Sequence, residues 1–131
     1  MSEENLERFR QATAAWNRRD LEGHLDFFDP EIEWSPGFTR VEGGVYRGRE
    51  GIRQFWADVD SGFDELVPDF DEVRDLGDTV VGLGRLRGRS NEGVPIDTQY
   101  GVVVRFRDGL AVSGSDLFSH ADALEAAGLS E

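Results

Sequence analysis

Apolar residues recur at helical spacing through the first half of the chain. A first stripe near the N-terminus predicts a helix that buries Leu6, Phe9, Thr13 and Trp16. Asp20 is typical of a helix N-cap and predicts a short second helix with Leu21, Leu25 and Phe28 inward. The segment "YRGREGIRQFWADVDSGF" predicts a third helix, whose buried positions are Ile52, Phe55, Trp56, Val59 and Phe63.

The second half of the chain alternates apolar and polar residues, which is typical of strands. "DPEIEWSP" predicts a turn and a brief strand through Ile32 and Trp34, followed by a loop from Pro36 to Gly44. "PDFDEVRDLG" predicts an acidic edge strand, and three more strands are predicted at "TVVGLGRLRGR", "PIDTQYGVVVRFR" and "LAVSGSDLF". Ser119 caps a last helix that Gly128 ends. Helices followed by strands indicate one α+β domain over residues 1–131, with helices packed on one face of an antiparallel sheet.

Composition narrows the function classes. The net charge is -13, with 27 acidic and 14 basic residues, which disfavours binding to nucleic acid or to an anionic membrane surface. All basic residues are arginine and there is no cysteine, so lysine Schiff bases and thiolate chemistry are excluded. The two histidines have no metal-ligand spacing, and we expect neither metal nor cofactor. Without a signal peptide or an apolar run of membrane length, a cytoplasmic location is expected.

One carboxylate interrupts the last predicted strand, where Val112, Gly114, Asp116 and Phe118 share a face. The turn "FRDGL" allows a two-residue loop of Asp108 and Gly109, or a three-residue loop that also includes Arg107. Hydrophobic matching favours the three-residue loop, because it aligns that face with the apolar face of the preceding strand. In that register Tyr100 lies directly opposite Asp116.

The strand before these two carries a row of glycines on one face. Gly82 and Gly84 are expected to face inward and to leave empty volume beside Asp116 and Tyr100. A curved sheet floored by glycine and covered by helices predicts a pocket, and the tryptophans available to cover it are Trp16, Trp34 and Trp56.

Five segments of the chain resemble those of a known family. The segments "AAWNRRDLEGHLDFFDPEIEWSP", "YRGREGIRQFW", "GRLRGR", "VVVRFRDGLAV" and "ADALEAAGL" are similar to the SnoaL-like branch of the nuclear transport factor two superfamily. The resemblance implies a cone-shaped, curved antiparallel sheet. Three N-terminal helices would pack on its concave face, followed by a short C-terminal helix. The fold itself hosts many activities and selects none of them.

The resemblance also implies roles for particular positions. Asp116 falls where SnoaL-like polyketide cyclases carry an acid that acts as general acid/base. The Arg and Asp that limonene-epoxide hydrolases add correspond to Gly84 and Leu86, so that network is absent. The base of ketosteroid isomerases corresponds to Ser35, and their two oxyanion-hole residues fall near Ala12 and Val102, so that mechanism is disfavoured.

The candidate site therefore has Asp116 and Tyr100 as catalytic residues. Its predicted pocket walls are Trp16, His24, Trp34, Tyr46, Trp56, Gly82, Gly84 and Phe118. The alternative for Asp116 is a buried structural carboxylate held by Tyr100, His24 or backbone donors. His24 could equally lie on a helix surface, and the tryptophans could be core residues.

The outward sheet face predicts a partner. Val81, Leu83, Val103, Ala111 and Leu117 would form an apolar patch rimmed by arginines, and the family commonly dimerises through its sheet. We therefore expect a homodimer. The predicted function is a small-molecule enzyme of cyclase, isomerase or lyase type, acting on an apolar, oxygenated substrate. The alternatives are a binding or accessory module that uses the same cavity without turnover, and a structural dimerisation domain.

Overall fold

The strands form one curved sheet with mixed pairing. The computed structural model describes residues 2–37 and 44–129, so most of the predicted loop from Pro36 to Gly44 lies outside the described residues. The strand order is β2-β1-β6-β5-β4-β3. The strands are β1 (Phe28–Ser35), β2 (Tyr46–Arg47), β3 (Phe63–Asp75), β4 (Thr79–Ser90), β5 (Pro95–Arg107) and β6 (Leu110–Leu117). Neighbours run antiparallel except β1 and β6, which are parallel.

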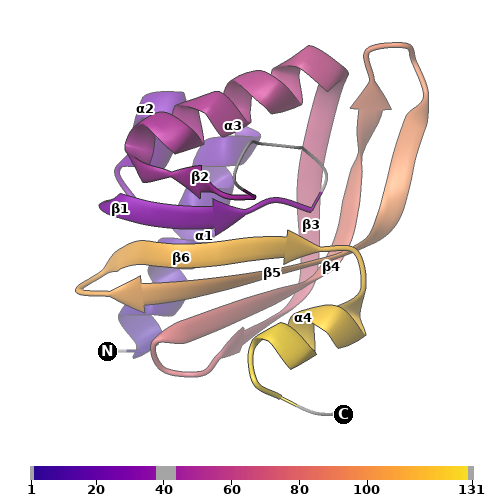
Figure 1. The fold of residues 1–131 in the computed structure, drawn as a ribbon. Helices are drawn as coiled ribbons and strands as arrows, with labels where there is room; N and C mark the ends of the chain where they lie inside the picture. Colours follow the sequence, from indigo (N-terminus) through magenta and orange to yellow (C-terminus); the bar gives the residue numbers. More distant parts are fainter. Residues whose placement is uncertain (1, 38–43, 130–131) are drawn as a thin grey trace.

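The described helices cover both faces of this sheet. Three pack on the inner face, namely α1 (Ser2–Asn17), α2 (Leu21–Leu25) and α3 (Gly48–Gly62). The fourth, α4 (His120–Ala126), lies on the opposite face (Figure 1). The predicted caps are confirmed: the side chains of Asp20 and Ser119 accept hydrogen bonds from backbone N–H groups within the first turns of α2 and α4. Gly128, with φ of 85°, ends α4 as predicted. The predicted α+β fold class is confirmed.

The edge strand is longer than its sequence pattern suggests. β3 starts at Phe63, directly at the end of α3, whereas the apolar spacing predicts helix up to that residue and strand only from Pro68. It pairs with β4 over its whole length and forms one edge of the sheet, so the predicted acidic edge strand is confirmed in position.

The turn between β5 and β6 corrects the predicted register. Asp108 and Gly109 both have positive φ, of 55° and 80°, and form a two-residue loop that pairs Arg107 with Leu110. An aspartate-glycine pair suits this left-handed turn, whose twist matches that of the strands. The predicted three-residue loop is therefore wrong.

A β-bulge then restores the predicted face. One extra residue of β6 lies between the pairs Phe106–Ala111 and Arg105–Ser113. As a result Val102, and not Tyr100, lies opposite Asp116, and Tyr100 pairs with Gly84 of β4 on its other side. The even-numbered residues of β5 still share the face of Asp116, because the shift is two residues in total.

The glycine row of β4 does not leave empty volume. A Cβ at Gly82 would meet the rings of Phe9 and Phe70 at 2.8 and 2.9 Å, so these rings already fill the space. A Cβ at Gly84 would collide with the β3 backbone at Asp69 and Phe70. The bulge in β3 brings that backbone close, and glycine is needed for the close approach. The predicted role of both glycines as pocket floor is wrong.

The outer face is covered by α4. Val81, Leu83 and Val103 pack against Ala123 and Leu124 of this helix in a second, smaller cluster. Gly101 permits this packing, since a Cβ there would lie 2.6 Å from the Cβ of Ala123. The chain's own last helix thus occupies much of the predicted apolar patch. Ala111 does not belong to the patch, because the bulge turns it into the inner core.

Candidate functional site

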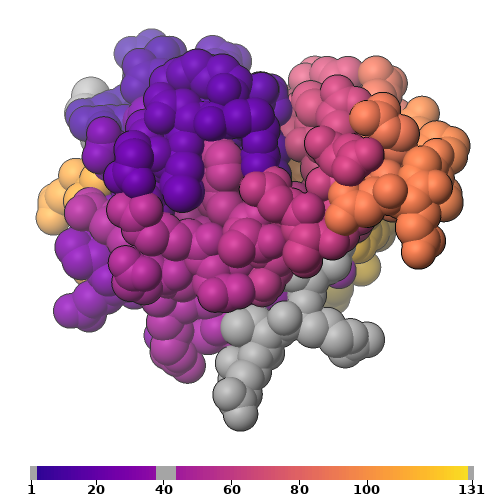
Figure 2. Space-filling model, turned by 90° about the horizontal axis from the view of Figure 1, so that it is seen from above, coloured from indigo at the N-terminus to yellow at the C-terminus, as the bar shows by residue number. Residues whose placement is uncertain are grey.

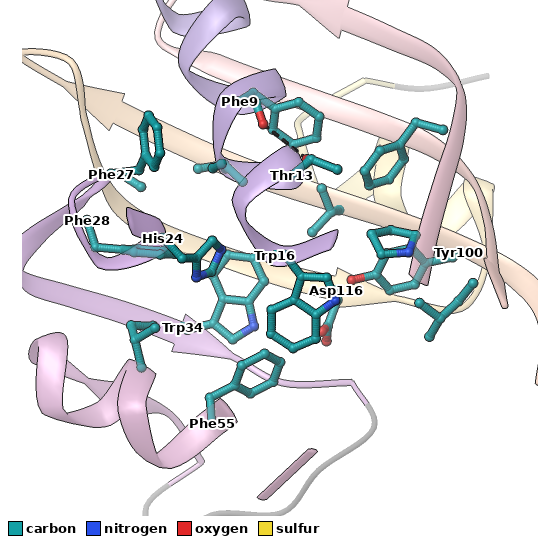
Figure 3. A pocket seen from close by; sticks show the side chains of 18 of the residues that line it. Phe9, Thr13, Trp16, His24, Phe27, Phe28, Trp34, Phe55, Tyr100 and Asp116 are labelled. Carbon is teal, nitrogen blue, oxygen red and sulfur yellow. Dashed lines mark hydrogen bonds between the residues drawn. The ribbon is translucent and has the colours of Figure 1, made fainter. Parts of the chain in front are cut away.

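An apolar cavity lies between the inner face of the sheet and helices α1–α3. The volume of this cavity is about 100 Å³, and the cavity is partly open to the surface. Figure 2 shows the surface hollowed between the N-terminal helices, in indigo, and the later strands, in pink and orange. Nearly half of the lining residues are Phe, Trp or Tyr (Figure 3), namely Phe9, Trp16, Phe27, Phe28, Trp34, Phe55, Phe70, Tyr100 and Phe106. Among the described lining residues, the ionisable side chains are His24, Tyr100 and Asp116.

Asp116 lies in the wall at the centre of the sheet, where β6 is flanked by β5 and β1. Its side chain is only 2 % exposed. The backbone N–H of Gly37, just beyond the end of β1, donates a hydrogen bond to Oδ1. Oδ2 is buried and has no hydrogen-bond partner among the described residues. Burial of a carboxyl oxygen without a hydrogen-bond partner disfavours the charged form, and donors near the carboxyl offset only part of this cost.

The pKa of Asp116 follows from this environment. Burial raises it from the usual 3.8 to about 7. The Gly37 N–H, the backbone N–H of Asp116 itself, the Trp34 indole and the Tyr100 hydroxyl favour the carboxylate and limit the rise in this pKa. The carboxyl is therefore poised to exchange a proton near neutral pH, which is the range that suits a general acid or base.

Tyr100 and Trp34 flank the carboxyl. The Tyr100 side chain lies beside Asp116 (Figure 3), although the two residues are not a cross-strand pair. Burial and the neighbouring Asp116 raise the pKa of Tyr100 well above its usual value, so the phenol keeps its proton. The Trp34 ring lies against Gly114, and its Nε1 is buried without a hydrogen-bond partner among the described residues. Both side chains are neutral donors close to Asp116.

His24 contributes the other ionisable group of the cavity wall, from α2. Its ring makes edge contacts with Trp16 and Phe28, at centroid distances of 5.8 and 4.9 Å. Nδ1 accepts a 3.0 Å hydrogen bond from the indole N–H of Trp56. Burial and the nearby Arg19 guanidinium lower the pKa of His24 to about 3, so the ring is neutral near pH 7.

Several predicted pocket residues lie elsewhere. Trp56 lies behind His24 and does not line the cavity. Tyr46 lies behind Phe55, with its hydroxyl 2.6 Å from Asp58 Oδ2. Phe118 lies beyond the end of β6 and is 39 % exposed. Three of the predicted wall residues line the cavity, namely Trp16, His24 and Trp34. The other five do not line it, and these are Tyr46, Trp56, Gly82, Gly84 and Phe118.

Gly37 is a site residue that the sequence pattern does not reveal. A Cβ at this position would lie 2.6 Å from the backbone oxygen of Asp116 and 2.8 Å from its Oδ1. Only glycine lets the chain after β1 approach the carboxyl this closely. The residues are 79 positions apart, and the sole local sign is the turn-like "SPG" after the strand.

The fold and this cavity define a class of small α+β domain, in which a curved, unclosed sheet wraps around helices and encloses an apolar cavity. The family model of the SnoaL-like domain matches residues 9–114. The chain therefore belongs to the SnoaL-like domain family. No curated protein matches the sequence.

Solved structures share the fold over nearly the whole chain. An NTF2-like protein of unknown function from Burkholderia pseudomallei is 27% identical, with a TM-score of 0.82 over 93% of this chain and 95% of that one. TerC, co-crystallised with polyporic acid, is 26% identical with a TM-score of 0.80, over 93% and 96%. A putative SnoaL-like polyketide cyclase from Jannaschia sp. is 19% identical with a TM-score of 0.75, over 87% and 84%, and shows the fold alone.

Helix length and hydropathy bear on the expected location. Among the described residues, no helix is long and apolar enough to cross a membrane.

Proposed function

We propose that this protein is a small-molecule enzyme in which Asp116 moves a proton to or from carbon next to a carbonyl group. One observation carries the proposal: a buried carboxyl with a pKa of about 7 lies in the wall of an apolar cavity. A carboxylate in water has a pKa near 4 and is a weak base at neutral pH. The cavity wall strengthens it as a base while leaving part of it ionised.

The proposed step balances within the site. The Asp116 carboxylate takes the α-proton, the C–H electron pair moves into a new C=C bond, and the carbonyl oxygen gains negative charge. The neutral hydroxyl of Tyr100 and the Trp34 indole N–H are donors beside Asp116 that support such an oxyanion. The protonated carboxyl then returns its proton to carbon. Ring closure, isomerisation and elimination all begin with this step.

Two findings support a small organic ligand. The wall is rich in aromatic rings, which suits flat, unsaturated molecules. The similar protein TerC was crystallised with polyporic acid. We propose a ligand that is largely apolar and carries oxygen.

The proposal is tested with 2-tetralone, a bicyclic aromatic ketone with exchangeable α-hydrogens. Exchange of these hydrogens for deuterium in D₂O at neutral pH is followed by NMR. The wild-type protein should accelerate exchange over buffer, and Asp116→Asn should lose about 10²-fold or more of that acceleration. The amide is nearly isosteric, and its oxygen can still accept the Gly37 hydrogen bond.

A binding module without turnover gives a different result in the same experiment. Wild type and Asp116→Asn would both bind 2-tetralone, detected by ligand-observed NMR, and exchange would match the buffer rate in both. This alternative is favoured because Gly84 and Leu86 stand where the family resemblance places the additional Arg and Asp of limonene-epoxide hydrolases. Equal exchange rates for the two proteins contradict the enzymatic proposal.

A further inference from the structure

The hydrogen bond between Trp56 and His24 determines which ring nitrogen of His24 carries the proton. Trp56 Nε1 can only donate, so His24 Nδ1 must be the acceptor in their 3.0 Å hydrogen bond. A neutral imidazole carries one proton, and that proton must then be on Nε2. Packing fixes the ring in this orientation, since it lies against Trp16, Phe28 and Trp56.

Among residues 2–37 and 44–129, the Nε2 proton of His24 has no acceptor. His24 lines the cavity, and no described residue accepts a hydrogen bond from its Nε2. Trp16 Nε1 can only donate and bonds the Leu66 backbone oxygen, and no hydrogen bond joins His24 to Thr13, whose hydroxyl donates to the Phe9 backbone oxygen. His24 therefore carries an N–H donor on Nε2 while its ring lines the cavity, and the hydrogen bond from Trp56 fixes the position of that proton.

Burial, and after it a nearby positive charge, keeps this donor neutral. The Arg19 guanidinium lies over the Trp16 and Trp56 rings, 5.1 and 4.4 Å from their centroids, and its charge opposes protonation of the imidazole. Asp20 has the opposite effect, but it is the smallest of the three influences, and burial is the largest. A neutral donor binds an uncharged oxygen without having to pair a buried charge.

We propose that His24 Nε2–H is a specificity-determining donor that binds a carbonyl-type oxygen of the ligand. Figure 3 shows His24 on the other side of the Trp16 and Trp34 rings from Tyr100 and Asp116. The ligand class is therefore a flat, unsaturated ring system with an acceptor oxygen at the His24 end and its reactive position toward Asp116. This inference deepens the proposed function and rests on it in taking the cavity as the ligand site.

The tautomer is tested first, on the unmodified protein. The chain has two histidines, and His120, which contacts the Gly84 backbone oxygen outside the cavity, serves as the reference. In ¹⁵N-histidine NMR between pH 5 and 9, His24 should remain neutral with its proton on Nε2. A proton on Nδ1, or titration of His24 near pH 6.5, would overturn the inference.

The ligand is tested with coumarin and 2H-chromene, which share a bicyclic frame and differ by C=O against CH₂. Affinities are compared in wild type and in His24→Phe, which keeps a flat ring and removes the N–H. The preference for coumarin, measured as the ratio of the two Kd values, should fall by about threefold to tenfold in the variant. In wild type, coumarin and not 2H-chromene should shift the Nε2 proton resonance.

Other outcomes are decided by two further variants. Trp56→Phe removes the donor to Nδ1, frees the tautomer and should lower the preference for coumarin in part. Asp97→Asn changes an exposed carboxyl that does not line the cavity, and it should keep the full preference. Exchange of 2-tetralone at the buffer rate in wild type, with the preference for coumarin intact, would contradict the proposed function alone. An unchanged ratio in His24→Phe, or no binding of coumarin, would contradict the inference.

Discussion

Replacing Asp116 by asparagine should stabilise the protein at alkaline pH. The pKa of Asp116 is about 7 in the folded protein and about 3.8 when unfolded, so folding takes up a proton between these values. The stabilisation that comes from protonated Asp116 is therefore fully present below pH 4 and is lost as the pH rises through 7. Three pKa units at 1.36 kcal/mol each amount to about 4 kcal/mol, of which roughly 3 kcal/mol fall between pH 5 and 9. Asparagine does not ionise and escapes this loss.

The assay is denaturant unfolding of both proteins at pH 5, 7 and 9. The contributions of all other titrating groups cancel in the difference between the two free energies of unfolding. From pH 5 to 9, this difference should change by roughly 3 kcal/mol, with Asp116→Asn becoming the more stable protein. Asp97→Asn is the matched control: Asp97 is exposed and its hydrogen bond with Arg85 lowers its pKa, so this difference should stay constant over that range. A constant difference for Asp116→Asn would refute the raised pKa.

Three further predictions follow from the same structure. As the pH falls from 6.5 to 4, the free energy of unfolding of His24→Phe should rise by roughly 3 kcal/mol relative to wild type, measured by denaturant unfolding. The reason is that a His with a folded pKa of about 3 destabilises the wild-type fold over this range. A constant difference between the two proteins would contradict the neutral state of the His24 ring. Gly37→Ala should raise the pKa of Asp116 further in an NMR titration and destabilise the fold by about 1–3 kcal/mol, because it disrupts the N–H donor to Oδ1. Gly62→Ala, where a Cβ meets open space, is its control, and equal effects of the two would refute the contact. We also propose that the protein forms a homodimer through the part of the outer face beside α4, which is lined by Glu33, Ser35, Arg105, Ser113 and Ser115. Size-exclusion chromatography with light scattering at micromolar concentration should give twice the mass of the chain, and the mass of a monomer would contradict this proposal.

The face occupied by Asp116 could be read from the sequence because strand parity is robust. A shift of two residues leaves every side chain on its face, so the wrong turn length still turned Asp116 inward. The partner across the strand is more sensitive, and Tyr100 was misplaced by two residues. "FRDGL" is compatible with both loops, and the bulge that reconciles them depends on the neighbouring strands rather than on local residues.

The cavity itself was harder to predict, because it depends on what other elements fill. Gly82 and Gly84 look like empty floor along one strand, but Phe70 and the β3 backbone occupy their space. Trp56 has the helical spacing of a pocket residue, and yet its indole faces His24 from behind. The contact of Gly37 with Asp116 joins residues that no periodicity relates. Sequence pattern gives faces and elements, whereas side-chain neighbours require the packed structure.

The chemical shift of the Asp116 carboxyl carbon reports directly whether this side chain exchanges its proton near neutral pH. The protein labelled with ¹³C at the aspartate side-chain carboxyl is titrated by NMR, and Asp116→Asn identifies the resonance of Asp116. The midpoint of this titration should lie at about pH 7. A midpoint near 3.8, the usual value for an aspartate, would contradict it.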